Sequence, residues 1–244
     1  MQNTITIARR ELRSFFDSLV AYVVVGLSML AIGLIFFLYN GGIWQVDRAN
    51  FGLMFEAIPW MLAILVIPLV TMRALAEEKR SGTLELLITM PVKDSEVILG
   101  KYLAALGMCV ILLGCSLLYP IAMFVWPWHL GALDWGPIWA GYFGLVLFCG
   151  AGCALGLLFS SITESQIIAF FFTAFSLVLL VAIGTLTQWV HGGLGDVMAF
   201  LSFKSRFDGF ARGLIDTRAV VYFLSIALVC LLVSFRSLES RKWS

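Results

Sequence analysis

Charged residues are scarce in this sequence. Asp, Glu, Lys and Arg together make up 13% of its 244 residues, whereas 61% of the residues are hydrophobic. A soluble domain carries about 25% charged residues, so this composition excludes a water-covered globule. Apolar runs of about 20 residues, the length needed to cross a bilayer, recur along the chain. The sequence therefore predicts an all-α, polytopic membrane protein with little soluble mass.

Residues that carry chemistry are also few and scattered. The chain has two histidines, and a net charge of +1 offers no basic surface for nucleic acid. No His, Asp or Glu accompanies Cys149 and Cys153 to suggest a metal site. Lys101 follows Gly100, but the upstream glycine of a P-loop and its final Ser or Thr are missing. We therefore expect no catalysis and no cofactor bound by this chain, and any energy must come from a partner.

Six apolar segments are predicted to span the membrane. They cover about residues 19–39, 57–72, 97–125, 138–160, 166–189 and 219–235. Pro68 lies inside the second segment, where its missing N–H favours a kink. Gly100, Gly107 and Gly114 recur every seven residues in the third, and Gly152-xxx-Gly156 lies in the fourth. Small residues at such spacing are typical of faces where helices pack closely.

Residues 1–18 predict an amphipathic helix lying in the membrane interface. Its apolar face has members at helical spacing: Ile5, Ala8, Leu12, Phe15, Phe16 and Leu19. Arg9, Arg13 and Asp17 occupy the opposite face, where the arginines would meet lipid headgroups or a partner protein. The helix is therefore either a topology anchor or a contact for a partner, and no cleavable signal is expected because no small-residue cleavage site follows it.

Two polar stretches interrupt the apolar segments. The first, residues 73–96 with Lys101 just beyond it, holds most of the charge in the first half of the chain. A charge near the bilayer centre costs about 3 kcal/mol on insertion scales, so this loop lies outside the membrane. The second stretch, residues 190–218, predicts two short interfacial or re-entrant helices at about 197–203 and 207–214, separated by a turn at Lys204 and Ser205.

Lys and Arg set the expected orientation. Six spans place both termini on one side, which then holds eleven of the 16 Lys and Arg residues, against five on the other side. The positive-inside rule assigns the richer side to the cytoplasm. Both termini and the loop at residues 73–96 are therefore expected in the cytoplasm.

The sequence EEKRSGTLELL from Glu77, followed by MPV from Met90 and LGK from Leu99, resembles the signature after the second span of ABC-2 type transporter permeases. SRFDGF from Ser205, RGLID from Arg212 and YFL from Tyr222 resemble the branch associated with gliding motility and copper-enzyme maturation. The resemblance covers essentially the whole chain as one transmembrane domain, residues 1–244.

This resemblance implies a half-transporter in the bacterial cytoplasmic (inner) membrane. Two six-span subunits, either two copies or one copy with a related permease, would work with two cytoplasmic ATP-binding subunits that hold ATP and Mg. A coupling helix is expected at residues 81–90, and the residues implied at the ATPase interface are Glu77, Glu78, Lys79, Arg80, Gly82, Thr83, Glu85, Arg9 and Arg13. Re-entrant helices would cap the exit side, with Arg206, Phe207, Asp208, Arg212, Gly213 and Asp216.

Two functions follow as hypotheses. In the first, the chain is a permease that exports an unidentified substrate by alternating access, with Glu85 as an exposed ATPase contact, Lys79 and Arg80 as its electrostatic neighbours and Gly82 in the turn. In the second, it is a mechanical or scaffolding component that passes ATPase motion to periplasmic or membrane accessory partners, and no substrate crosses.

Overall fold

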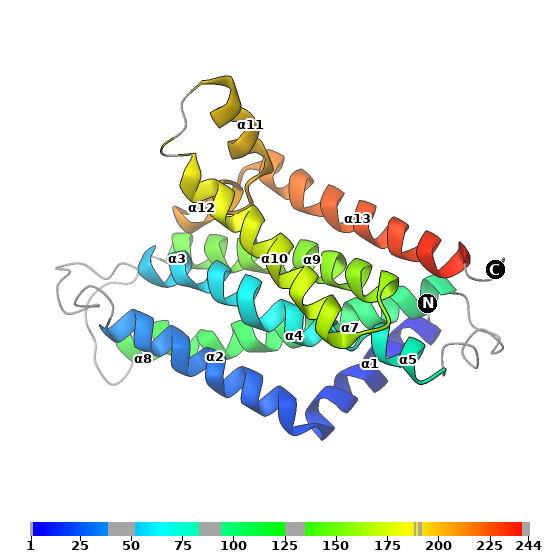
Figure 1. Ribbon diagram of the computed structural model, residues 1–244. Coiled ribbons are helices and arrows are strands. Elements are labelled where there is room, and N and C mark those ends of the chain that lie inside the picture. The colour runs from blue at the N-terminus through cyan, green and yellow to red at the C-terminus, as the bar shows by residue number, and fades with distance from the viewer. Residues whose placement is uncertain are drawn as a thin grey trace.

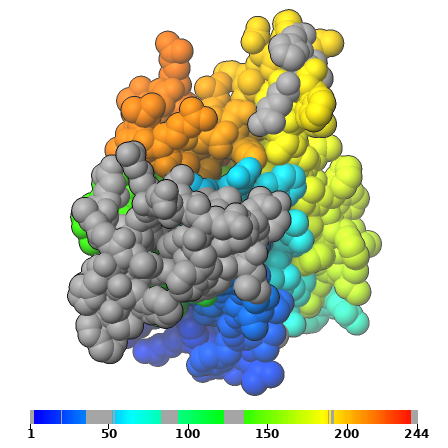
Figure 2. All heavy atoms as spheres, turned by 90° about the vertical axis from the view of Figure 1, so that its left-hand side faces the viewer, coloured from blue at the N-terminus to red at the C-terminus, as the bar shows by residue number. Residues whose placement is uncertain are grey.

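The computed structural model describes residues 2–38, 52–82, 94–124, 135–187, 189 and 192–240, and throughout these residues the regular structure is helical. The helices run mostly along one direction as a bundle, with the N- and C-termini at the same end (Figure 1). Figure 2 looks onto the opposite end, where α11, α12 and the start of α13, coloured yellow to orange, form the upper part. The predicted all-α class is confirmed for the described residues.

The helices are α1 (Gln2–Asp17), α2 (Leu19–Leu38), α3 (Gly52–Met61), a π-helical segment (Leu62–Val66), α4 (Ile67–Thr71), α5 (Ala76–Arg80), α7 (Asp94–Ser116), α8 (Leu118–Phe124), α9 (Trp135–Ile162), α10 (Gln166–Leu186), α11 (Gly193–Leu201), α12 (Phe203–Ala211) and α13 (Thr217–Ser240).

Five helical stretches among the described residues are long and apolar enough to cross a membrane. They are Met54–Arg80, Asp94–Ala122, Trp135–Ile162, Gln166–Leu186 and Thr217–Glu239. The pair Asn3–Asp17 and Ala21–Ile35, bent by 74°, gives a sixth candidate if it is counted as one broken span. The chain is therefore a multi-pass membrane protein with five to six candidate spans, against the six that the sequence predicts.

Helix α9 forms the centre of the bundle and contacts α13, α12, α7, α10 and α4. Most of its residues are buried, and many of them are Gly, Ala, Cys or Ser. Such small side chains let neighbouring helices approach closely. A Cβ on Gly144 would lie 2.7 Å from Phe210, and one on Gly141 would overlap the Phe55 ring, so neither position has room for a side chain.

The two glycine stripes predicted as packing faces have identifiable neighbours. In α9, Gly152 faces Ile67 and Gly156 faces Thr71, so the Gly152-xxx-Gly156 pair packs against α4 of the same chain. In α7, Gly100 lies against Ile7 of α1, with 2.7 Å between an added Cβ and Ile7 Cγ2. Gly107 is in ordinary contact range of Leu12, whereas no described residue lies within 4 Å of a Cβ on Gly114. α1 therefore packs against the first two glycines of the α7 stripe.

The second span differs from the prediction in where it begins and how it accommodates proline. Its candidate span, Met54–Arg80, begins before residue 57 and extends beyond residue 72, and Met54 and Phe55 are buried inside the bundle. The irregularity expected at Pro68 takes the form of the π-helical segment Leu62–Val66, where the Ile67 N–H reaches back to the Leu62 carbonyl. Pro68 stands at the start of α4, directly after this segment, so the wider helical turns lie where its missing N–H interrupts the regular hydrogen bonding.

The turn predicted at Lys204 and Ser205 is wrong, because both residues lie inside α12. The break between the two short helices falls at Ser202, whose backbone is extended. Its hydroxyl accepts the Ser205 N–H at 3.1 Å, so Ser202 serves as the N-cap of α12. Ser is among the residues preferred at this position because its oxygen satisfies a free N–H of the first turn.

Candidate functional site

Helix α5 continues the second span at the end of the bundle that holds both termini, and leads toward residues 83–93 (Figure 1). Its start is held by one side chain of α9. The Ser160 Oγ accepts the N–H groups of Leu75 and Ala76, both at 3.0 Å, and donates to the Met72 carbonyl at 3.3 Å. The first N–H groups of a helix have no partner within it, so Ser160 satisfies them from outside.

A second contact ties α5 to the same end of α9. The Lys79 ammonium donates to the Ser161 carbonyl, which also lies 3.4 Å from the Ser237 Oγ of α13. Cations favour the carbonyl end of a helix because its last C=O groups lack intrahelical partners. Residues of α5, α9 and α13 therefore meet at one point.

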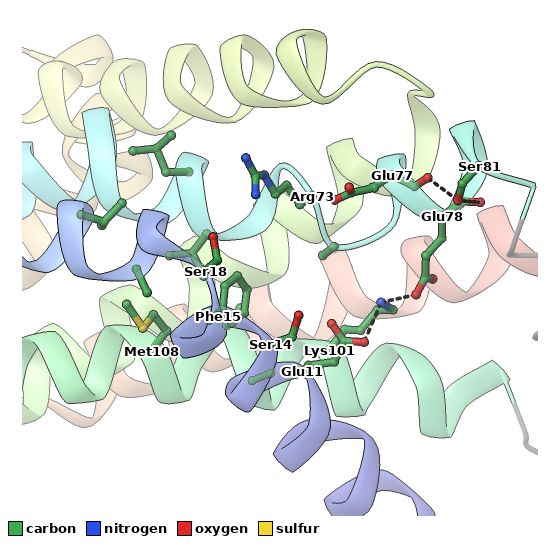
Figure 3. Close-up of a pocket in the computed structure, with 17 residues that line it drawn as sticks. Glu11, Ser14, Phe15, Ser18, Arg73, Glu77, Glu78, Ser81, Lys101 and Met108 are labelled. Carbon is green, nitrogen blue, oxygen red and sulfur yellow. Dashed lines mark hydrogen bonds and ion pairs between the residues drawn. The ribbon is translucent and has the colours of Figure 1, made fainter.

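The Lys101 cluster consists of Lys101 of α7, Glu78 of α5 and Glu11 of α1. The Lys101 Nζ lies 2.7 Å from Glu78 Oε1 and 3.3 Å from Glu11 Oε1 (Figure 3). The Lys101 side chain is 3% exposed, and those of Glu78 and Glu11 are 19% and 22% exposed. A charge so far from water is stable only when it is paired. The cluster therefore holds three sequence-distant helices together.

A cavity of about 370 Å³ opens beside this cluster, between α1, α4, α5 and α7. Arg73, Glu77 and Ser81 line its polar part together with the cluster (Figure 3). Phe15 and Met108 belong to its apolar part. The cavity separates α1 from the end of the second span. The ion pairs of the Lys101 cluster connect these two parts of the bundle.

Most residues predicted at the ATPase interface lie at this end, but they do not form one constellation. Glu77 and Arg80 are exposed, whereas Glu78 and Lys79 are half-buried in the contacts above. Arg9 and Arg13 are exposed on α1, on the side away from the cavity that Glu11, Ser14 and Phe15 line. They therefore remain available to a partner or to lipid headgroups.

The turn that follows α5 is described only at its start. The Ser81 N–H donates to the Glu77 carbonyl at 3.0 Å, and Gly82 has a positive φ of 70°. Ser81 and Gly82 thus end α5, and glycine is favoured there because it adopts this backbone conformation without strain. Thr83, Glu85 and the rest of the coupling helix predicted at residues 81–90 lie outside the described residues.

Sequence reasoning missed Lys101, Glu11 and Ser160 as members of this site. One signal was present for Lys101, because a lysine about one turn inside the predicted apolar span 97–125 calls for a carboxylate partner. Its partners could not be chosen, since Glu78 and Glu11 lie 23 and 90 positions away along the chain. Ser160 carried no such signal, because serine is common in packed spans.

The residues predicted at the exit side lie at the other end of the bundle. Phe207 is buried, with its ring 6.2 Å from that of Phe55. Gly213 has a positive φ of 86° and donates its N–H to the Phe210 carbonyl at 2.9 Å, which ends α12. Both residues therefore fix the position of α12.

The charged members of that region have separate roles. Burial raises the pKa of the Asp208 carboxyl above its ordinary value; nearby Lys204 and Arg212 lower this pKa and Glu56 raises it. Asp216 begins α13, because its Oδ1 accepts the Arg218 N–H at 2.9 Å. Arg212 is exposed, and the Arg206 guanidinium lies over the adjoining rings of Phe200 and Tyr222. The structure therefore does not gather these residues into one site.

Among the described residues, no group of three or more His, Cys, Asp or Glu side chains is placed to hold a metal ion. The two ends of the bundle hold contacts that link neighbouring helices, together with charged side chains. A membrane-embedded helical bundle, with polar contacts gathered where its second span leaves the membrane, defines the chain as a multi-pass membrane protein.

The model of the ABC-2 family transporter proteins matches residues 45–236. This is more than half of the chain, which therefore belongs to the ABC-2 family of transporter proteins. It is a membrane permease of that family, which is not catalytic by itself and works with ATPase partners. No curated protein matches the chain.

Proposed function

We propose that this chain is the exporting permease subunit of an ATP-driven transporter, and that separate ATP-binding subunits drive it through α5 and the adjoining residues 83–93. The observation that carries the proposal is the attachment of α5. This five-residue helix contacts α9 through Ser160 and Ser161, α7 through Lys101, and α1 through the shared lysine. A force applied at residues 83–93 would therefore reach three helices at once.

The arrangement suits transmission of motion from an ATPase. α9 is largely buried, and it contacts α4, α10, α12 and α13, so a shift at its Ser160 end would reorient its neighbours. α1, which carries the exposed Arg9 and Arg13, would move with α7 because both share the Lys101 cluster. Closure of the ATP-bound subunits would thus rotate the bundle between its two access states.

The remaining parts of the proposal follow from the same assignment. The end with both termini and α5 would face the cytoplasm, and α11 and α12 would cap the exit side. A second permease, either another copy or a related chain, would complete the pathway. ATP and Mg would be held by two ATPase subunits. The motifs around Ser205 and Arg212 support placement in the gliding-motility and copper-enzyme-maturation branch.

Glu85→Arg tests the docking site. We expect the variant to insert into the membrane normally but to lose the ATPase subunit on mild-detergent purification, or to keep it without stimulated ATP hydrolysis. Glu239→Arg is the matched control, because it reverses the same charge at the same end on α13, where Glu239 pairs with Arg236. Normal assembly together with normal stimulated hydrolysis in Glu85→Arg would overturn the docking assignment.

A further inference from the structure

A second cavity, of about 520 Å³, lies at the end of the bundle away from the termini. Its lining comes from Phe200 at the end of α11, Arg206 of α12 and the first turns of α13. α13 is a candidate membrane span that begins at Thr217. Its first turns therefore lie at the level where hydrocarbon meets water, whichever way the protein is oriented. The cavity opens where lipid headgroups are found.

Arg206 is held in a fixed position in this cavity. Its guanidinium carbon lies 4.9 Å from the centre of the Phe200 ring and 5.5 Å from that of Tyr222. The Tyr222 hydroxyl donates to the Leu201 carbonyl at 2.6 Å, which fixes this ring against α11. The Arg206 Nε is buried and has no hydrogen-bond partner among the described residues. A guanidinium held in this way can donate its other N–H groups to an acceptor oxygen that enters the cavity it lines.

Arg218 supplies a second positive charge to the same cavity. It is the second residue of α13, and its side chain is exposed. The nearby Asp216 carboxylate accepts the Arg218 backbone N–H, so it caps the helix. Lys204, the neighbouring cation on α12, is paired with Glu56 at 3.1 Å. Arg206 and Arg218, in contrast, form no ion pair among the described residues.

An apolar stripe continues from the cavity along α13. Val221 lines the cavity, and Leu224, Leu228 and Leu232 follow at helical spacing. Each of these four side chains is more than half exposed. In Figure 1 α13 runs along the outer edge of the bundle toward the end with the termini. The stripe therefore extends from headgroup level into the hydrocarbon layer, in line with the charged pocket.

We propose that this cavity binds an anionic phospholipid, with its phosphate on Arg206 and Arg218 and its acyl chains along the stripe of α13. Guanidinium groups bind phosphate through paired hydrogen bonds, which gives both affinity and orientation. A cation pair above an apolar stripe matches an amphipathic molecule with a negative head. The bound lipid would join α12 to α13. This inference does not depend on how the ATPase drives the chain.

The test counts lipid retained by the full-length protein in nanodiscs of equal parts phosphatidylglycerol and phosphatidylcholine, by native mass spectrometry after release. We expect phosphatidylglycerol to be retained in preference to phosphatidylcholine. The Arg206→Gln/Arg218→Gln variant should retain about fivefold less phosphatidylglycerol, because two charge-assisted contacts are lost. Arg206→Lys should lose part of the retention, since lysine keeps the charge but not the planar fork.

Arg212→Gln is the matched control, because Arg212 is an exposed arginine at the same end that does not line the cavity. Equal loss in this control would show that general positive charge is responsible and would overturn the proposal. Equal retention of both lipids by the unaltered protein would also overturn it. Displacement of phosphatidylglycerol by inorganic phosphate at equal concentration would identify a free-anion site instead. Near-UV circular dichroism identifies misfolded variants. If the double variant misfolds, the lipid retention of Arg206→Lys is used as the test.

Discussion

α5 and α12 both pack against the central helix α9, at opposite ends of the bundle, but they are attached by different interactions. α5 is held by a serine hydroxyl, a lysine on a backbone carbonyl and the Lys101 cluster. α12 is held by three buried phenylalanines, Phe203, Phe207 and Phe210. Phe203 lies 5.4 Å from Phe148 between ring centres, and Phe210 sits over Gly144.

This difference bears on which end can move. Buried aromatic packing allows few alternative arrangements, because side chains interdigitate at near-crystalline density. The Ser160 and Lys101 contacts of α5 are buried, but each is a separate hydrogen bond or ion pair that can be exchanged for another polar partner, and a typical hydrogen bond contributes about 1 kcal/mol net. The α5 end can therefore rearrange step by step, whereas the α12 end is expected to stay fixed or to move as a unit.

Removing an aromatic anchor from α12 should give the largest effect. Phe207→Ala is expected to lower the free energy of unfolding by about 4 kcal/mol, because it leaves a cavity beside Phe55. The measurement is SDS titration of the purified protein in mixed micelles. Phe175→Ala is the control, since Phe175 is exposed on α10 and should change stability by less than about 1 kcal/mol. Similar losses in both variants would contradict the assignment of α12 as a packed anchor.

Removing the cation from the Lys101 cluster should come next. Lys101→Met leaves Glu78 and Glu11 facing each other, and we expect a loss of about 3 kcal/mol, the low end for a broken buried pair because both carboxylates are partly exposed. Stimulated ATP hydrolysis should fall further than ATPase binding.

The charge reversal Glu78→Lys/Lys101→Glu is the companion of this variant. It restores one ion pair between α5 and α7 but places the introduced carboxylate next to that of Glu11, so only partial recovery is expected. Adding Glu11→Gln should improve the recovery, because it removes the repulsion. If the triple variant is no more stable than Lys101→Met, charge does not hold α1, α5 and α7 together.

The bundle itself could be predicted from the sequence, because apolar runs of span length are a strong signal. Asp94 and Glu96, which the sequence predicts in the preceding loop, stand in the first turn of α7, where acidic side chains favour a helix N-terminus. The Gly152 and Gly156 pair correctly indicated a packing face, but its neighbour α4 was not predictable, because spacing alone does not identify the partner helix. Lys101, Ser160 and the break at Ser202 depend on contacts across the fold that a single sequence does not specify.

Removing the serine that receives α5 should cost less than either change above. Ser160→Ala leaves the Leu75 and Ala76 N–H groups without their acceptor, and we expect a loss of about 2 kcal/mol. Ser161→Ala is an unusually close control, because Ser161 is equally buried and its hydroxyl donates to the Leu158 carbonyl of its own helix. Equal loss of stability in the two variants would show that Ser160 contributes to stability through its burial rather than through the attachment of α5.

The smallest effect is expected at the end of α12. Substitutions at two glycines there distinguish the effect of backbone conformation from that of packing. Gly213→Ala should destabilise by about 1–2 kcal/mol, the cost of a left-handed conformation for an L-residue, because Gly213 has a φ of 86° and the added Cβ would lie 3.3 Å from Pro137. Gly209→Ala should stabilise by about 0.5–1 kcal/mol, since alanine suits a helix interior better and, within the described part of the chain, its Cβ meets nothing closer than 3.7 Å.

Both variants add one methyl group near the end of the same helix, and SDS titration compares them directly. Opposite signs would show that α12 ends where it does because of the Gly213 backbone. Destabilisation by both would instead mean that the outer end tolerates no added volume, and the fixed attachment of α12 would then rest on tight packing throughout. Stabilisation by Gly213→Ala would contradict the left-handed turn itself, and with it the abrupt passage from α12 into α13.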